Sequence, residues 1–432
     1  MSTRATDYKE KALRLHEKYR GKIEVVPKVP IKSLDDFSIW YTPGVAAPCR
    51  AIYSDKEKVY TYTWRWNLVA VVSDGSRVLG LGNIGPEAGY PVMEGKCLLF
   101  KYLGGVDAVP ILLNTQDKDE IISIVKKISP SFGGINLEDI AKPKCFYILE
   151  TLQQELDIPV WHDDQQGTAL VTLAALKGAL KVVNKRLSEV KIALIGAGAA
   201  GVAIAKYLMV AGAKPENMLV VDSKGILHAN RKDIPKENRW KKDLAFKTNP
   251  VCISGGIKEA LRGADVCIAV SKPGPGVIKK DWIKNMADDA IVFACANPVP
   301  EIWPWEAKEA GARIVATGRS DFPNQVNNSL GFPAIFRGVF EVQARKITDT
   351  MCLAAADALA EYTEKTSLSE DRIIPTMEET EAYVCEAVAV GLKAIEEGVA
   401  RVKLSKKELE ERCRENIYRA RKLASALFKT LA

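Results

Sequence analysis

The chain has 432 residues, 47% of them hydrophobic, with 61 lysines and arginines against 54 aspartates and glutamates, which gives a formal net charge of +7. This length exceeds what one hydrophobic core usually organises, so we expect two domains with additional segments. The interleaved charges argue against a nucleic-acid partner. No apolar run approaches the roughly 20 residues that span a bilayer, and the charged residues 1–20 lack the apolar stretch of a secretory signal. We therefore expect a cytoplasmic protein without membrane contact.

The first part of the chain alternates strand patterns with helical patterns. Residues 1–20 predict an amphipathic helix, and the segment 40–48 (WYTPGVAAP) predicts a turn followed by the start of a helix. Strands are predicted at 68–72, 78–82, 106–112, 131–138 and 160–161, and helices at 93–103 and 120–129. This alternation is typical of an α/β domain with a largely parallel sheet.

A second α/β unit follows, and the end of the chain is helical. A helix is predicted at 167–183, and strands are predicted at 190–195, 218–222, 266–270, 290–294 and 314–316. After residue 344 only helical patterns occur. We therefore predict an N-terminal α/β substrate and metal domain (1–162), a Rossmann-type dinucleotide-binding domain (163–345) and a helical C-terminal segment (346–432).

A glycine-rich loop joins an apolar strand to a helix in the second unit. The loop consists of Gly196, Ala197, Gly198, Ala199, Ala200 and Gly201. A GxGxxG sequence alone is weak, but a preceding strand, a following helix and Asp222 at the end of the next strand complete the fingerprint of a dinucleotide-binding site. The alternative is a glycine-rich packing turn. Asp222 favours NAD, whereas Ser223, Lys224 and the basic residues 231–232 could hold the 2′-phosphate of NADP, so both cofactors stay open.

Two pairs of acidic residues follow predicted strands. Glu138-Asp139 ends one apolar run, and Asp163-Asp164 follows another. Adjacent carboxylates repel one another unless a cation offsets their charge, and oxygen ligands suit Mg²⁺ or Mn²⁺. The chain has only three histidines, so any metal site must consist mainly of carboxylates. The alternative for these acids is helix capping in exposed turns, and His162 beside them is more typical of a structural residue than of a ligand.

Further polar residues lie in turn or helix contexts that do not define a role alone. Tyr41 is at a proline-marked turn, Asn297 follows an apolar strand, and Asn328 lies in a loop. Lys96 is near the start of a largely apolar helix. It is either a surface lysine whose stem is buried or a desolvated lysine with a lowered pKa.

Taken together, these segments resemble the malic enzyme family. The matching pieces occur in order between about residue 40 and about residue 335, and they are YTPGVA, SDGSRVLGLGNIGPEAGYPVMEGK, INLED, VWHDDQQGTA, IGAGAAG, ACANP and NQVNNSLGFP. The resemblance implies oxidative decarboxylation of L-malate to pyruvate and CO₂ with NAD or NADP and with Mg²⁺ or Mn²⁺. It also implies a homodimer.

The resemblance assigns expected roles residue by residue. Tyr41 matches the general acid, Lys96 the general base, and Asp163 a supporting catalytic aspartate. Glu138, Asp139 and Asp164 match the metal ligands. Arg77, Lys96, Asn297 and Asn328 match substrate-binding residues, with Lys96 expected to be desolvated and neutral. The alternatives are a metal-independent dehydrogenase of hydroxy or amino acids and a non-catalytic regulator that binds nicotinamide nucleotides.

Overall fold

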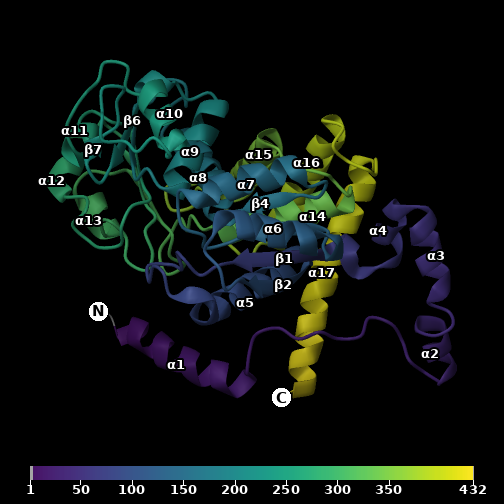
Figure 1. Ribbon diagram of the computed structural model, residues 1–432. Helices are drawn as coiled ribbons and strands as arrows, with labels where there is room; N and C mark the ends of the chain where they lie inside the picture. Colours follow the sequence, from purple (N-terminus) through teal and green to yellow (C-terminus); the bar gives the residue numbers. More distant parts are fainter. Residues whose placement is uncertain (1–2, 432) are drawn as a thin grey trace.

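The structure is a computed structural model that describes residues 3–431, and it contains two largely parallel sheets (Figure 1). The first sheet has the order β2-β1-β3-β4, and all its neighbouring strands are parallel. Its strands are β1 (Leu68–Ser73), β2 (Asp107–Leu112), β3 (Gly134–Leu137) and β4 (Val160–His162). Helices α5 (Gly85–Gly104), α6 (Lys118–Ile128) and α7 (Lys144–Glu155) accompany it.

The central strand β1 is buried on both faces. Val69 and Val71 belong to the hydrophobic cluster that contains Met93 of α5. Ala70 and Val72 belong to a second cluster, which contains side chains of α6 and α7. Because successive residues of a strand point to opposite faces, this continuous apolar run places one layer of helices on each side of the sheet.

The second sheet has the doubly wound arrangement that the sequence predicts. Its order is β10-β9-β8-β5-β6-β7, and only β7 is antiparallel to its neighbour. Its strands are β5 (Ile192–Ile195), β6 (Met218–Asp222), β7 (Gly225–Ile226), β8 (Val266–Ala269), β9 (Ile291–Ala294) and β10 (Ile314–Thr317). The accompanying helices are α8 (Thr168–Val182), α9 (Ala199–Val210), α10 (Arg239–Lys247), α11 (Ile257–Leu261), α12 (Lys280–Ile283) and α13 (Pro304–Glu309). The strand order reverses beside β5, which is where ligands bind in such sheets.

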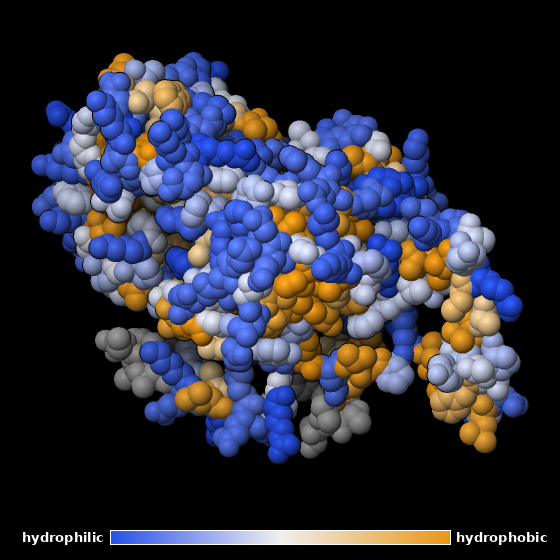
Figure 2. Space-filling model, in the orientation of Figure 1, coloured by the Kyte–Doolittle hydropathy of each residue, from blue (hydrophilic) through white to orange (hydrophobic). Residues whose placement is uncertain are grey.

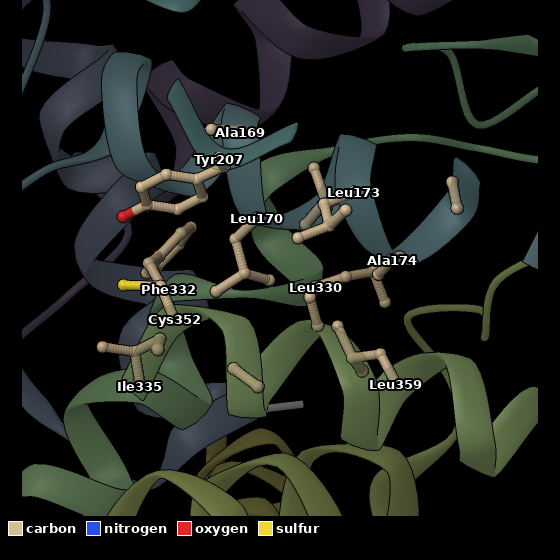
Figure 3. Close-up of a cluster of buried hydrophobic side chains, with 14 of the residues drawn as sticks. Ala169, Leu170, Leu173, Ala174, Tyr207, Leu330, Phe332, Ile335, Cys352 and Leu359 are labelled. Carbon is tan, nitrogen blue, oxygen red and sulfur yellow. The ribbon is translucent and has the colours of Figure 1, made fainter. Parts of the chain in front are cut away.

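The C-terminal helices join the two sheets. They are α14 (Phe332–Glu341), α15 (Asp349–Ser367), α16 (Thr380–Glu396) and α17 (Lys406–Leu431). Figure 3 shows the junction, where Leu170 and Leu173 of α8 meet Phe332 of α14 and Leu359 of α15. The helical C-terminal segment is confirmed over the described residues. The domain boundaries at 162 and 345 stay predictions, because one hydrophobic cluster includes residues from all three segments.

An N-terminal arm precedes the first sheet. It contains α1 (Thr3–Tyr19), α2 (Asp35–Trp40), α3 (Ala46–Ser54) and α4 (Val59–Tyr62). Figure 1 shows α2 and α3 at the edge of the molecule, away from both sheets, and neither helix has a buried residue. Figure 2 shows apolar surface on this part of the molecule. Residues 1, 2 and 432, which the predicted segments include, lie outside the described residues.

Two predicted elements of the first unit differ from the structure. Residues 78–82 do not form a strand of the sheet; Val78 and Gly82 make an isolated bridge within a loop. Gly82 and Gly85 have positive φ, which bends the backbone away from an extended path. The helix predicted at 93–103 begins earlier, at Gly85, with a proline in its first turn. Proline fits there because the first helical N–H groups lack partners within the helix.

None of the helices within residues 3–431 is both long enough and apolar enough to cross a membrane.

Candidate active site

The two acidic pairs lie together at one edge of the first sheet. Strands β3 and β4 are parallel neighbours, with Leu137 opposite His162. Glu138-Asp139 and Asp163-Asp164 therefore leave the sheet at adjacent positions. Glu138, Asp139 and Asp163 are buried, whereas Asp164 is partly exposed.

Three of these carboxylates could hold a cation. Glu138, Asp139 and Asp164 each offer one oxygen, and these oxygens lie within 4.8 Å of one another. The Asp139 amide donates to Asp164 Oδ2 at 3.0 Å, and buried Asp139 Oδ2 has no hydrogen-bond partner among the described residues. Burial and the charge of Asp164 raise the pKa of Asp139 to about 8. An all-oxygen set with an unsatisfied buried carboxylate atom fits Mg²⁺ or Mn²⁺.

His162 does not belong to this oxygen set. Its Nδ1 is 3.8 Å from Asp164 Oδ2, which is too long for a hydrogen bond. Burial lowers the pKa of this histidine, so its ring is neutral. His162 is therefore a buried neutral side chain beside the acidic cluster rather than a member of the oxygen set.

Lys96 extends from α5 into the acidic cluster. Its Nζ lies 2.6 Å from Asp163 Oδ2 and 3.1 Å from Glu138 Oε1, and 4.4 Å from the centre of the Phe332 ring. Burial acts to lower the pKa of Lys96, but the charges of Asp163 and Glu138 raise it above its usual value. The prediction of a neutral lysine with a lowered pKa is therefore wrong for this arrangement. The sequence alone could not show that two carboxylates contact the Lys96 ammonium.

Asp163 is positioned from several directions. Trp161 donates its indole N–H to Asp163 Oδ1 at 3.0 Å, while Lys96 binds the other oxygen. Asp163 also begins a π-helical turn, η4 (Asp163–Gly167), an uncommon geometry that is frequent at functional sites. A Cβ on Gly167 would lie 2.0 Å from Asp163 Oδ1 and 3.3 Å from Asn328 Cβ, so only glycine fits between these residues. Asn328 therefore lies beside the acidic cluster.

Arg77 and Asn297 lie in loops near the cluster without contacting its carboxylates. The Arg77 amide donates to the Asp139 carbonyl at 3.0 Å, but its exposed guanidinium donates to the carbonyl of Leu79. Asn297 meets the same loop, because its carbonyl oxygen would lie 3.2 Å from a Cβ built on Gly80. The loop after β1 and the loop after β9 therefore approach each other from the two sheets.

Tyr41 is not brought to this cluster. It ends α2 on the N-terminal arm, and its side chain is 73% exposed. Among the described residues, no contact joins it to Lys96 or to the four acids. Within one chain, the site that the sequence predicts therefore lacks its tyrosine.

The glycine-rich loop has the geometry of a dinucleotide site. A Cβ on Gly196 would lie 2.6 Å from the Val270 carbonyl oxygen, and a Cβ on Gly201 would lie 1.8 Å from the Gly196 carbonyl oxygen. Gly198 caps the N-terminus of α9, whose free N–H groups attract phosphate. Ala197 lies in the turn between β5 and α9, and Ala199 and Ala200 are the first two residues of α9.

Asp222 ends β6 as predicted, but one of its partners could not be recognised from sequence patterns. Arg231 Nη1 and Lys241 Nζ each lie 2.8 Å from an Asp222 oxygen. Lys241 is on α10, outside any recognisable motif, so only the fold could bring it here. Ser223 and Lys224 are exposed, and the Lys224 amide donates to Asp222.

A dinucleotide-binding sheet beside a buried lysine and an oxygen-donor cluster defines an oxidoreductase that depends on NAD or NADP. Residues 20–153 match the model of the malic enzyme N-terminal domain, and residues 165–395 match that of the malic enzyme NAD-binding domain. The chain belongs to the malic enzyme family.

Individual relatives agree with this assignment over most of their length. The bifunctional malic/malolactic enzyme of Bacillus subtilis is 49% identical over 94% of this chain and 98% of its own. The NADP-dependent malic enzyme of Halomonas elongata is 42% identical over 92% of this chain and 96% of its own. The crystal structure of malic enzyme from Pyrococcus horikoshii is 55% identical, with a TM-score of 0.93, and covers 98% of this chain and 99% of its own.

Proposed function

We propose that the chain oxidises and decarboxylates L-malate to pyruvate and CO₂, with a divalent cation and with reduction of NAD or NADP. The observation that carries this proposal is the cluster of Lys96 against Asp163 and Glu138, beside the oxygen donors of Asp139 and Asp164. When bound, the cation would polarise the C1 carboxylate and C2 oxygen of malate and the nicotinamide would accept the hydride from C2. Glu138, Asp139 and Asp164 are the residues that would hold the cation.

Lys96 and Asp163 would move the proton of the C2 hydroxyl. Asp163 Oδ2 is 2.6 Å from Lys96 Nζ, so it can take a proton from the ammonium and leave the amine free to accept the hydroxyl proton. The two groups share their protons, so the pair acts as a unit. The overall reaction releases no proton, because the one that leaves the hydroxyl is balanced by the one that C3 gains when CO₂ departs.

Loop side chains would hold the substrate. Arg77 is exposed beside Asp139, and its guanidinium can turn from its own loop to a substrate carboxylate. Asn297 and Asn328 approach from the second sheet, where they can hold malate near the nicotinamide. This arrangement argues against a metal-independent dehydrogenase, which needs no carboxylate cluster, and against a regulator, which needs no buried lysine within it.

The test is the appearance of reduced nicotinamide with L-malate, Mn²⁺ and either NAD or NADP. We expect activity with at least one cofactor, pyruvate as the product, and a loss of at least about 100-fold when EDTA removes the metal. Activity that persists in EDTA would instead support the metal-independent dehydrogenase, and binding of nicotinamide without turnover of any hydroxy acid would support the regulator.

We further propose that the chain forms a homodimer whose arms complete the sites. The arm exposes large apolar side chains, among them Leu34 at 84% and Tyr53 at 92%. Surface of this kind usually marks a contact with another protein. The proposed reaction needs a donor for C3, and Tyr41, which matches the family's acid, is on this arm rather than near Lys96. The exposed apolar arm and the distance of Tyr41 from its own chain's site therefore both favour a second copy of the chain as the partner of the arm.

Complementation between inactive variants tests this arrangement. Tyr41→Phe and Lys96→Ala should each be nearly inactive alone. When they are co-expressed, each mixed dimer should contain one site with neither substitution, so activity should return to about a quarter of the wild-type value. Lys96→Ala co-expressed with Asp163→Ala is the matched control, because both changes fall in the same chain's cluster. A mixture that stays inactive would place Tyr41 in its own chain's site or in none.

A further inference from the structure

A buried glutamate, Glu301, joins the two loops that follow β8 and β9. Its side chain is 0% exposed. Its Oε1 accepts from the Ser271 amide at 2.8 Å and from the Ser271 hydroxyl at 3.0 Å, and its Oε2 accepts from the Ala296 amide at 3.0 Å. Both amides lie two residues beyond the end of their strand. One side chain therefore fixes the backbone of both loops where they leave the second sheet.

The usual structural reasons for a buried carboxylate do not account for Glu301. Among residues 3–431, no lysine or arginine forms an ion pair with it, and its donors are N–H and O–H groups. Nor does it cap α13, because Glu306 accepts from the Trp303 amide there at 3.2 Å. Burial raises the pKa of Glu301, while the bonds from Ser271 and Ala296 act to lower it. A carboxylate buried at this cost serves the two loops.

The loop after β8 packs against the glycine-rich loop. The Val270 carbonyl oxygen and the Ser271 amide nitrogen lie 2.6 Å and 3.4 Å from where a Cβ on Gly196 would be. Any side chain larger than hydrogen at Gly196 would therefore push this loop away. The position of Ser271 is thus tied to the loop that we expect to bind the pyrophosphate.

The loop after β9 faces the first sheet. It contains Asn297, which directly follows the Ala296 amide bonded to Glu301. The Asn297 carbonyl oxygen lies 3.2 Å from where a Cβ on Gly80 would be, in the loop after β1. Its Nδ2 lies 2.7 Å from where a Cβ on Gly318 would be, after β10. Asn297 therefore occupies a narrow place between the two sheets.

The direction in which a dinucleotide crosses the sheet places its reactive half at these loops. In a doubly wound sheet the cofactor lies across the point where the strand order reverses, which here is beside β5. Its adenosine half would lie toward β6 and its pyrophosphate at the start of α9. The nicotinamide half then extends over the ends of β8 and β9, between the loops that Glu301 joins.

We propose that Glu301 is a positioning residue for hydride transfer: it holds the loops after β8 and β9 at a fixed separation, and so places the nicotinamide and the Asn297 side chain relative to malate. This inference rests on the proposed function and adds a residue to it. Glu301 acts through Ser271 and Asn297 and touches neither ligand itself. The separation matters because a displacement of about 1 Å between reacting groups can cost about 100-fold in rate.

Replacing Glu301 by glutamine tests the proposal by binding, without turnover. Glutamine has nearly the same shape but only one oxygen. That oxygen can keep both Ser271 donors, and the new amide N–H then opposes the Ala296 N–H and releases the loop after β9. The reduced dinucleotide should bind about tenfold more weakly, which corresponds to one lost hydrogen bond to a charged group. ADP-ribose, which lacks the nicotinamide, should bind within about twofold of the wild type. Fluorescence and calorimetric titrations of the full chain measure the two affinities.

Kinetics with malate give a second measurement that a merely structural role would not move. For Glu301→Gln we expect kcat to fall by about 10- to 100-fold and the KM of malate to rise, because Asn297 is displaced as well. The isotope effect with malate deuterated at C2 should be larger than in the wild type, since hydride transfer becomes slower than the other steps. A loss of folded protein alone would lower kcat and leave the KM, the isotope effect and both affinities unchanged.

Two further variants serve as control and as substitute. Glu306→Gln removes a carboxylate that accepts from a backbone amide only five residues further on, at the start of α13. It should lower the melting temperature and leave both affinities and the isotope effect unchanged. Ser271→Ala removes only the hydroxyl donor to Glu301 and should weaken the reduced dinucleotide by about twofold to fivefold, with ADP-ribose nearly unchanged. This variant decides the question if Glu301→Gln does not fold.

The inference is overturned if Glu301→Gln leaves both affinities unchanged or weakens them equally, or if kcat falls while the KM of malate and the isotope effect stay the same. A wild type that binds the dinucleotide but does not turn over malate would defeat the proposed function, and the two affinities would still decide the role of Glu301. A wild type that binds no dinucleotide would overturn both proposals.

Discussion

Replacing Lys96 by alanine should lower turnover by about 100- to 10,000-fold, which is the range that a positioned acid–base group contributes. Its Nζ is buried between Asp163 and Glu138, so the substitution removes the amine that would pass the hydroxyl proton to and from Asp163. The loss should appear in kcat, because the proton transfer occurs only as the reaction proceeds. Steady-state kinetics with saturating Mn²⁺ and cofactor measure it.

The variant must also be shown to fold. Lys96→Ala leaves Asp163 and Glu138 without their cation, which costs stability in a buried site. Thermal unfolding with bound Mn²⁺ should show that the protein remains folded. Lys101→Ala is the matched control: it removes a lysine from the same helix, where the side chain pairs with Asp107 at the surface, and it should retain near-normal turnover. A turnover of Lys96→Ala within tenfold of the wild type would exclude the assigned role.

Much of the architecture could be predicted because local patterns determine it. Apolar runs such as 68–72 and 190–195 are long enough to be buried strands, and their alternation with helices restricts the sheet to parallel connections. Parallel strands end at a common edge, so the residues after 137 and after 162 had to lie near each other once β3 and β4 became neighbours. The acidic cluster follows from this rule.

What could not be predicted depends on contacts between segments that are distant in sequence. The protonation of Lys96 depends on Asp163, which is 67 residues away, and the state of Asp222 depends on Lys241, which is 19 residues away. Neither spacing is a motif. The loop at 78–82 has an apolar pattern like that of a strand, but Leu79 and Gly82 adopt positive φ and turn the backbone back. The exposed arm likewise contains helix signals that say nothing about what the helices pack against.

Replacing Asp164 by asparagine should weaken Mn²⁺ binding by at least about 100-fold, since even changes to residues outside the ligand set of a metal cost 10- to 100-fold. Asparagine keeps an oxygen that can accept from the Asp139 amide, as Asp164 Oδ2 does at 3.0 Å, so the local fold should persist. It removes the charge that raises the pKa of Asp139. Titration of free Mn²⁺ by electron paramagnetic resonance measures the affinity directly, without turnover.

The direction of the stability change distinguishes a metal ligand from a structural acid. In the absence of cations, Asp164 repels Asp139, so Asp164→Asn should unfold at the same temperature as the wild type or at a higher one. With Mn²⁺ the order should reverse, because only the wild type gains the stability that a bound ligand supplies. Asp119→Asn, an exposed acid on α6, should change neither value. If Asp164→Asn binds Mn²⁺ normally, the Asp164 carboxylate is not a metal ligand, and the assignment of Glu138, Asp139 and Asp164 as the ligand set has to be replaced.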